Sequence, residues 1–112
     1  MNQNEVEKAK ALIIIEIIEY VPNGVLTKTI IKKATGNISV MSFDAGEGLQ
    51  EKTSPFDTFV QIIDGQAEVV IDGVSHSLGI GQGIVLPAHL PNVFQANERF
   101  KMILSTIKSG YE

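Results

Sequence analysis

The chain has 112 residues, of which 44% are hydrophobic and 20% charged, a composition that indicates a folded globular protein and excludes an intrinsically disordered one. Its formal net charge of −4 lacks the positive field that a phosphate backbone requires, so we expect no nucleic acid partner. The absence of cysteine excludes disulfides, thiolate nucleophiles and thiolate metal sites.

The first 24 residues form an extension whose secondary structure the sequence leaves open. Asn4 followed by Glu7 has the spacing of a helix cap with its reciprocal partner, which predicts a short helix near residues 4–10. The isoleucine-rich segment Leu12–Ile18 favours a strand, because side chains branched at Cβ pack well in sheets. We therefore expect a short helix or a strand here, followed by a turn at Pro22–Gly24.

The most apolar stretch of the chain is Ala11–Ile18, which is interrupted by Glu16. It is far too short to span a bilayer, so we expect no membrane partner. It also lacks the basic leader and the small-residue cleavage site of a signal peptide. We therefore expect a soluble cytoplasmic protein.

From Val25 onward the chain reads as short strands separated by turn signals. Asp64-Gly65 and Asp72-Gly73 are the strongest of these signals, because both central residues of such tight turns need positive φ. Many short strands with almost no helix between them predict an all-β sandwich or barrel rather than a parallel α/β sheet. The predicted strands are Val25–Lys32, Asn37–Phe43, Thr58–Ile63, Glu68–Ile71, Val74–Leu78, Ile84–Leu86, Asn92–Ala96 and Phe100–Ile107.

Two groups of glycine, proline and polar residues have a more specific spacing. They consist of Gly46, Lys52, Ser54, Thr58 and Gly65, and of Gly81, Pro87, His89 and Asn92. These intervals resemble the two conserved motifs of the cupin superfamily. The first motif reads Gly, five residues, His-x-His, three or four residues, Glu, six residues, Gly; the second reads Gly, five residues, Pro-x-Gly, two residues, His, three residues, Asn. The spacing fits both motifs without a gap, and the resemblance covers roughly residues 36–107.

The resemblance implies a cupin-type jelly-roll β-barrel, in which two sheets wrap over one core. We therefore predict an all-β protein that forms a single cupin domain over residues 1–112, with the core barrel at about 25–108 and the extension at 1–24. The motif glycines would stand at sharp corners or at positions with positive φ. Residues 52, 54 and 58 share parity, so their side chains are expected on one face of a hairpin, which the resemblance identifies as the barrel interior.

All four metal ligands that the resemblance implies are replaced in this sequence. Lys52 and Ser54 stand at the two histidine positions of the first motif, Thr58 stands at its glutamate, and Asn92 stands at the histidine of the second. A protonated lysine repels a divalent cation, and hydroxyl groups are weak ligands compared with imidazole, carboxylate or thiolate. The two histidines of the chain lack a convincing third ligand, so we predict no metal and no other cofactor.

The same four residues are the main candidates for a ligand pocket. We hypothesise that Lys52 anchors a carboxylate or another anion, while the other three offer neutral hydrogen bonds. Two environments for Lys52 remain open: a solvated position at the barrel mouth, or an apolar enclosure that would favour the neutral amine and allow it to act as a base or Schiff-base nucleophile. Further pocket candidates, each with loop exposure or core packing as its alternative, are His89 on the rim and Phe43, Phe94 and Met102 on the wall.

Two interpretations of function follow. The first is a metal-free cupin that binds a small ligand in its barrel, with an anion as the candidate, or that acts as a dimeric assembly module. Small cupins often dimerise by packing sheets together or exchanging an N-terminal strand, and the apolar segment Leu12–Ile18 suits such an interface, so we predict a homodimer. The alternative is an enzyme, either a metal-independent isomerase or lyase that uses Lys52 or His89, or a cupin metalloenzyme with an atypical site. The missing ligands favour the first interpretation, since a fold by itself does not imply a function.

Overall fold

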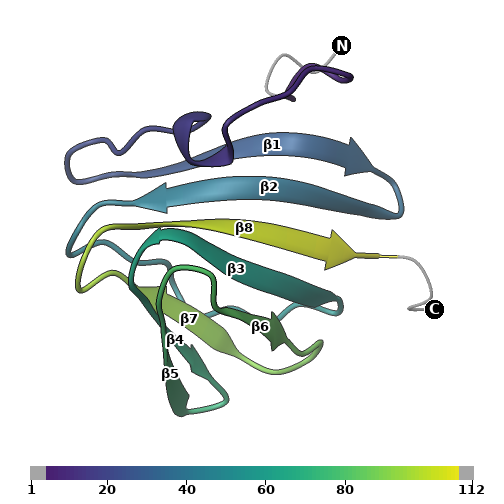
Figure 1. Cartoon of the computed structure of the whole chain (residues 1–112). Helices are drawn as coiled ribbons and strands as arrows, with labels where there is room; N and C mark the ends of the chain where they lie inside the picture. Colours follow the sequence, from purple (N-terminus) through teal and green to yellow (C-terminus); the bar gives the residue numbers. More distant parts are fainter. Residues whose placement is uncertain (1–4, 109–112) are drawn as a thin grey trace.

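The computed structural model describes residues 5–108, which fold into two antiparallel sheets (Figure 1). One sheet has the strand order β1-β2-β8-β3-β6 and the other has the order β5-β4-β7. Each predicted strand is present, and its ends differ from the prediction by a residue or two at most. The strands are β1 (Val25–Lys33), β2 (Gly36–Phe43), β3 (Asp57–Gly65), β4 (Ala67–Ile71), β5 (Val74–Leu78), β6 (Gly83–Leu86), β7 (Asn92–Gln95) and β8 (Phe100–Ile107).

The all-β jelly-roll prediction is therefore confirmed, and the core lies between the two sheets. Alternate residues of each strand face inward, so Val60 and Ile62 of β3 are fully buried together with Met102 of β8. Among the described residues, no helix is long and apolar enough to cross a membrane.

Three phenylalanines pack together at one end of this core. Phe43 and Phe100 are paired residues of β2 and β8, and their rings stack with centroids 4.5 Å apart. Phe94 of β7 reaches across from the smaller sheet and lies 6.4 Å from each of the other two rings. Burying each ring stabilises the fold by roughly 2–3 kcal/mol, so this cluster holds the two sheets together at that end of the barrel.

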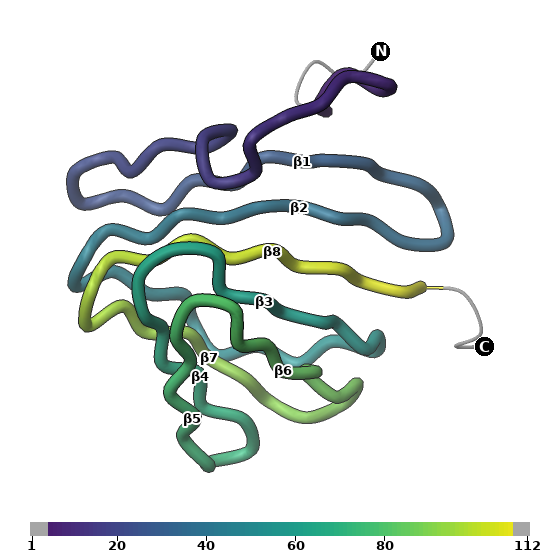
Figure 2. The backbone as a smooth tube through the Cα atoms, viewed as in Figure 1, coloured from purple at the N-terminus to yellow at the C-terminus, as the bar shows by residue number. Residues whose placement is uncertain are grey.

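The N-terminal extension differs from the prediction. Asn4, the expected cap, lies outside the described residues, and between residues 5 and 24 the structure contains neither the helix near 4–10 nor the strand at 12–18. A 3₁₀ turn, η1 (Ile14–Glu16), takes their place, and Figure 2 shows the segment passing over the β1 side of the larger sheet. Because the segment lies over the sheet face and does not pair with the edge strand β1, its β propensity alone does not make it a strand.

Side chains of the sheet hold this segment in place. Lys101 of β8 donates a hydrogen bond to the carbonyl oxygen of Ile15 at 2.7 Å, and Ser42 of β2 donates one to that of Glu19 at 2.7 Å. The Tyr20 hydroxyl donates to an Asp64 carboxylate oxygen at 2.6 Å. Burial, followed by this hydrogen bond, raises the pKa of Tyr20 above its usual range, so the phenol stays protonated and keeps donating.

The motif glycines adopt the positive φ angles that the resemblance implied. Gly65 ends β3 with a φ of 72°, and Gly81 has a φ of 85° in the turn before β6. At Gly65 the neighbouring chain also comes very close, because an added Cβ would lie 2.0 Å from the carbonyl oxygen of Arg99. At Gly81 an added Cβ would meet nothing within 4 Å.

The pair gives a matched test of this close approach. Gly81→Ala should lower the free energy of unfolding by about 1–2 kcal/mol, the conformational cost of a left-handed alanine. Gly65→Ala should lower it by roughly 3 kcal/mol or more, because the overlap with Arg99 adds strain to the same conformational cost. Urea denaturation of both variants measures the difference, and equal losses would contradict the close packing at Gly65.

Candidate functional site

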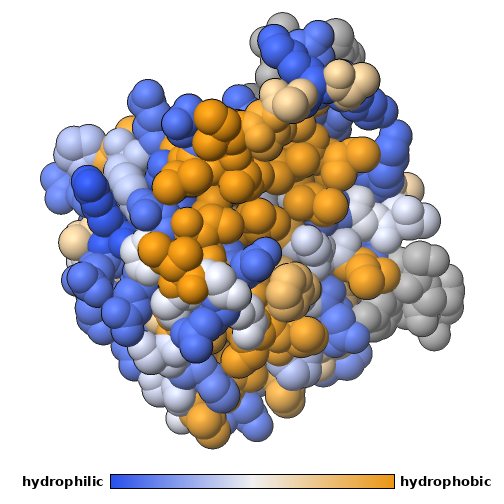
Figure 3. All heavy atoms as spheres, in the orientation of Figure 1, coloured by the Kyte–Doolittle hydropathy of each residue, from blue (hydrophilic) through white to orange (hydrophobic). Residues whose placement is uncertain are grey.

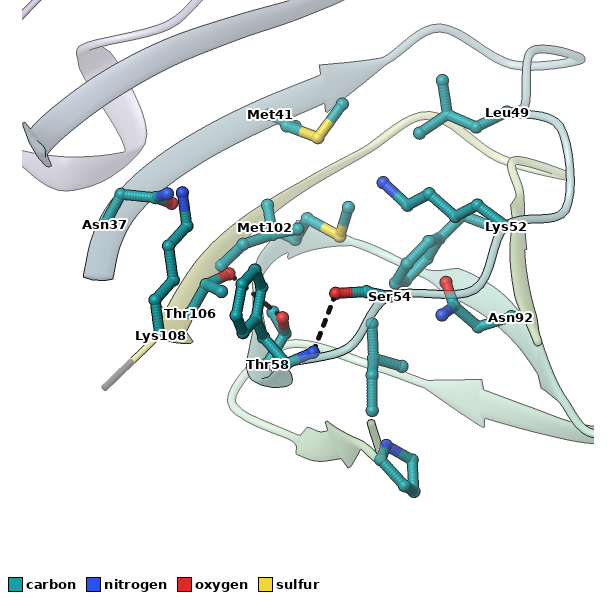
Figure 4. Close-up of a pocket in the computed structure, with 15 residues that line it drawn as sticks. Asn37, Met41, Leu49, Lys52, Ser54, Thr58, Asn92, Met102, Thr106 and Lys108 are labelled. Carbon is teal, nitrogen blue, oxygen red and sulfur yellow. Dashed lines mark hydrogen bonds between the residues drawn. The ribbon is translucent and has the colours of Figure 1, made fainter. Parts of the chain in front are cut away.

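A cavity of about 300 Å³ lies inside the barrel (Figure 4). It is lined by residues from the loop between β2 and β3 and from strands of both sheets. Its polar lining consists of Asn37, Lys52, Ser54, Thr58, Asn92, Thr106 and Lys108. Its apolar lining consists of Met41, Leu49, Phe56, Leu86, Pro87, Phe94, Met102 and Leu104.

The structure brings together all four residues that replace the expected metal ligands. Thr58 is in β3 and Asn92 is in β7, so each reaches the cavity from a different sheet. Lys52 and Ser54 also line the cavity, but they lie in the loop before β3 rather than in the predicted hairpin strand. The shared inward direction of the three first-motif positions is therefore correct, although only Thr58 belongs to a strand.

Backbone hydrogen bonds fix the loop over the cavity. Lys52 and Asn92 form an isolated antiparallel bridge, with the Lys52 amide 3.0 Å from the Asn92 carbonyl oxygen and the Asn92 amide 2.9 Å from the Lys52 carbonyl oxygen. Two residues farther along, the Ser54 carbonyl oxygen accepts a hydrogen bond from the His89 amide at 2.7 Å. The two motif regions, which lie far apart in the sequence, are thus joined at the site.

The polar side chains of the cavity differ in how well their hydrogen bonds are satisfied. The hydroxyl of Ser54 accepts a hydrogen bond from the Phe56 amide at 3.1 Å, and the hydroxyls of Thr58 and Thr106 bond to each other at 3.0 Å. Asn92 is only 5% exposed, and its Oδ1 is buried with no hydrogen-bond partner among the described residues. An unsatisfied buried acceptor costs about 1–3 kcal/mol, which makes Asn92 the exceptional polar group of the cavity.

The charge of the lining is entirely positive. Lys52 and Lys108 line the cavity, and no aspartate or glutamate is among its lining residues in the described part of the chain. Lys52 is exposed, so it occupies the barrel mouth, and the enclosed position that would have allowed a base or Schiff-base nucleophile is not found. Lys108 lies with its ammonium 5.8 Å from the centre of the Phe56 ring.

Two predicted pocket residues lie elsewhere. Phe43 is fully buried in the aromatic cluster and does not line the cavity, because its stacking partner Phe100 holds it at the other end of the core. His89 is exposed and is also not a lining residue; its backbone, rather than its side chain, serves the site. Its φ of 71° is a left-handed value at the motif position usually held by glycine, so the conformation has been kept without the residue that favours it. Phe94 and Met102 line the cavity as predicted.

Three polar residues of the lining were not predicted from the sequence. Asn37 is the second residue of β2, Thr106 is near the end of β8, and Lys108 follows that strand, so all three lie outside the two motifs. Asn37 and Thr106 meet because β2 pairs with β8 in antiparallel register. Only the pairing of strands so distant in the sequence could have identified them, and turn signals do not give such pairing.

The residues at the site do not fit a metal ion. A cation of the kind that the fold family implies needs imidazole, carboxylate or thiolate ligands, whereas this cavity offers ammonium, hydroxyl and amide groups. Within residues 5–108, there is no group of three or more histidine, cysteine, aspartate or glutamate side chains that could hold a metal ion.

Comparison with known proteins gives a consistent picture. No protein-family model matches the sequence, and no curated protein does either. A conserved protein of unknown function from Streptococcus pyogenes is 33% identical, with a TM-score of 0.87, over 92% of this chain and 90% of that one. A cupin 2 conserved barrel domain protein from Leptotrichia buccalis is 32% identical, with a TM-score of 0.81, over 84% of this chain and 46% of that one. A cupin superfamily protein from Desulfitobacterium hafniense is 28% identical, with a TM-score of 0.85, over 94% and 95% of the two chains.

Proposed function

Because this chain belongs to the cupin superfamily but carries none of the expected metal ligands, we propose that it binds a small organic anion in its barrel. Charge and hydrogen bonds, rather than a metal ion, would hold the ligand. The observation that carries the proposal is the lining of the cavity, which contains two lysines and no carboxylate in the described part of the chain.

This positive lining contrasts with the charge of the whole chain. The sequence has 13 acidic and nine basic residues, so a cavity lined at random would be expected to contain more carboxylates than ammonium groups. Within a cavity the effective dielectric constant is lower than in water, and an ammonium group there attracts an anion more strongly. The charge distribution therefore favours an anion over a neutral or cationic ligand.

The apolar lining and the volume favour an organic ligand. Met41, Met102 and Leu104 face the cavity beside the lysines and would contact a carbon skeleton. About 300 Å³ is at the small end of ligand pockets, which suits a compound of a few carbon atoms better than a large cofactor. A small carboxylate meets both requirements.

The enzymatic alternatives receive less support from the same geometry. A Schiff-base mechanism would gain from an enclosed lysine, but Lys52 is exposed, and an acid–base role for His89 would need its side chain in the cavity, where it is not a lining residue. We therefore place binding ahead of isomerase or lyase activity.

Removing the charge at the mouth tests the proposal. Lys52→Met should weaken the binding of small carboxylates about tenfold, because one charge-assisted interaction is lost while the aliphatic length is kept. Calorimetric titration with a panel of small mono- and dicarboxylates measures the change. Lys32→Met, at an exposed lysine of β1 outside the cavity lining, is the control and should leave affinity unchanged. Equal affinities in wild type and Lys52→Met would remove Lys52 from the site.

A dimeric assembly role is the second candidate, and the outer face of the larger sheet favours it. The strand register places Val85, Phe59, Ser105, Ile38 and Ile31 in one row across all five strands, which we call the outer row. Figure 3 shows apolar side chains gathered over this face. The N-terminal segment crosses the neighbouring part of the face, where it bonds to Ser42 and Lys101, and Val40 there is fully buried.

The outer row remains partly open to solvent. Phe59 is 45% exposed and Val85 is 53% exposed, although the two residues are paired neighbours. Large apolar side chains that lie exposed side by side on a sheet face are typical of a surface that another protein covers. The outer row crosses all five strands and is therefore a continuous strip, so we propose that a second copy of the chain covers it, row against row.

Light scattering tests the dimer directly. We expect the wild-type chain to elute with the mass of a dimer at micromolar concentration. Phe59→Lys combined with Val85→Lys should give a monomer, because two charges would be desolvated in the interface. Val74→Lys replaces an equally exposed valine on β5 of the other sheet and should leave the dimer intact. A wild-type monomer under these conditions would contradict the proposal.

A further inference from the structure

We infer that the anion bound in this cavity carries a hydroxyl group on the carbon next to its carboxylate, so that the ligand is a 2-hydroxycarboxylate. The inference rests on the proposed function, because it names the chemical class of the ligand at the same site.

Asn92 provides the first observation. Its Oδ1 is buried and has no hydrogen-bond donor among the described residues, although the side chain lines the cavity. Buried acceptors nearly always have a hydrogen-bond donor in folded proteins. An unpaired acceptor loses its hydrogen bonds to water on burial and gains no hydrogen bond in exchange, which lowers stability. A donor supplied by the ligand would complete the hydrogen bonding of this side chain.

The hydroxyl groups of the cavity already form hydrogen bonds within the protein, so they need a ligand less than Asn92 does. Ser54 already accepts a hydrogen bond from the backbone, and Thr58 and Thr106 already bond to each other. The Lys52 ammonium, at the mouth, has no carboxylate within salt-bridge distance in residues 5–108. At the end of the cavity where Asn92 lies, the unmet demands are therefore a hydrogen-bond donor for its Oδ1 and an anion for Lys52.

These two demands arise side by side. Lys52 and Asn92 face each other in an antiparallel bridge with both backbone hydrogen bonds formed. Opposite residues in such a pair have Cα atoms about 5.5 Å apart and side chains on the same face. Figure 4 shows both side chains at one end of the cavity, with Asn37 and Lys108 at the other. One ligand meets both demands when its anionic group and its donor lie close together, as the carboxylate and the hydroxyl of a 2-hydroxy acid do.

The donor must also be neutral. An ammonium group could donate to Asn92, but it would lie beside Lys52 in a cavity that carries a second lysine and no carboxylate in the described residues. Like charges at such short range repel, so a 2-amino acid suits the site less well than a 2-hydroxy acid. The carbon skeleton of the ligand would then extend toward Met102, which Figure 4 shows between the two lysines.

Three ligands of the same skeleton provide the test: 2-hydroxy-4-methylpentanoate, 4-methylpentanoate and leucine. Calorimetric titration of the wild-type chain should show that the hydroxy acid binds about tenfold more tightly than the deoxy acid, with leucine the weakest of the three. In Asn92→Leu, which has similar volume, the tenfold preference should fall to about onefold while 4-methylpentanoate keeps its affinity. Gln95→Leu, at an exposed amide of β7 outside the cavity lining, is the control and should keep the preference.

The possible results separate this inference from the proposed function. If both acids bind wild type equally, the hydroxyl inference is overturned and anion binding stands. If the preference persists in a folded Asn92→Leu variant, Asn92 does not read the hydroxyl and the inference is likewise overturned. If none of the acids binds at millimolar concentration, the proposed function fails and the inference fails with it. The comparison of ligands on wild type needs no variant, so it decides the question even if Asn92→Leu does not fold.

Discussion

Two backbone hydrogen bonds between Lys52 and Asn92 are the constraint on which the site depends. They fasten the loop between β2 and β3 onto β7, and so place a residue of the first motif against a residue of the second. Without this bridge, the exposed lysine and the buried asparagine would not share one cavity. The same bridge holds Lys52 beside Asn92, whose Oδ1 lacks a hydrogen-bond donor. For this reason we infer a ligand with a carboxylate for Lys52 and a neighbouring hydroxyl for Asn92.

The barrel leaves one end of its interior free for this arrangement. Phe43 and Phe100 stack at the other end, and Phe94, which also lines the cavity, packs against both rings and so joins the two sheets. Because that packing already joins the sheets, the cavity end can contain polar groups and an unsatisfied acceptor while stability is supplied elsewhere. The aromatic cluster and the cavity are thus neighbours in one core and share Phe94.

Much of the fold followed from local signals in the sequence. Alternating apolar residues and Asp-Gly turns located the strands, and the motif spacing placed Gly65 and Gly81 at positions with positive φ. The N-terminal segment was predicted wrongly because its conformation depends on tertiary contacts from Ser42, Lys101 and Asp64, which no local pattern reveals.

The site was predicted only as far as the motifs reach. The four positions that replace metal ligands line one cavity, whereas the places of Asn37, Thr106 and Lys108 depend on the pairing of β2 with β8. Phe43 was misplaced because strand parity gives the inward face without saying which end of the barrel a residue occupies. The sequence also could not predict whether Lys52 is exposed or buried. Lys52 lies in a loop, where side chains do not alternate between the inside and the outside as they do in a strand.

We propose that the residues at the four metal-ligand positions of the family make this cavity a site for an organic anion rather than for a metal ion. A calorimetric titration with Zn²⁺, comparing wild type with the variant Lys52→His, Ser54→His, Thr58→Glu and Asn92→His, tests it most directly. We expect no saturable binding in wild type, and about one Zn²⁺ per chain in the variant, because imidazole and carboxylate ligands would then converge on the cavity. Stoichiometric, saturable Zn²⁺ binding by the wild-type chain at this cavity would contradict the claim.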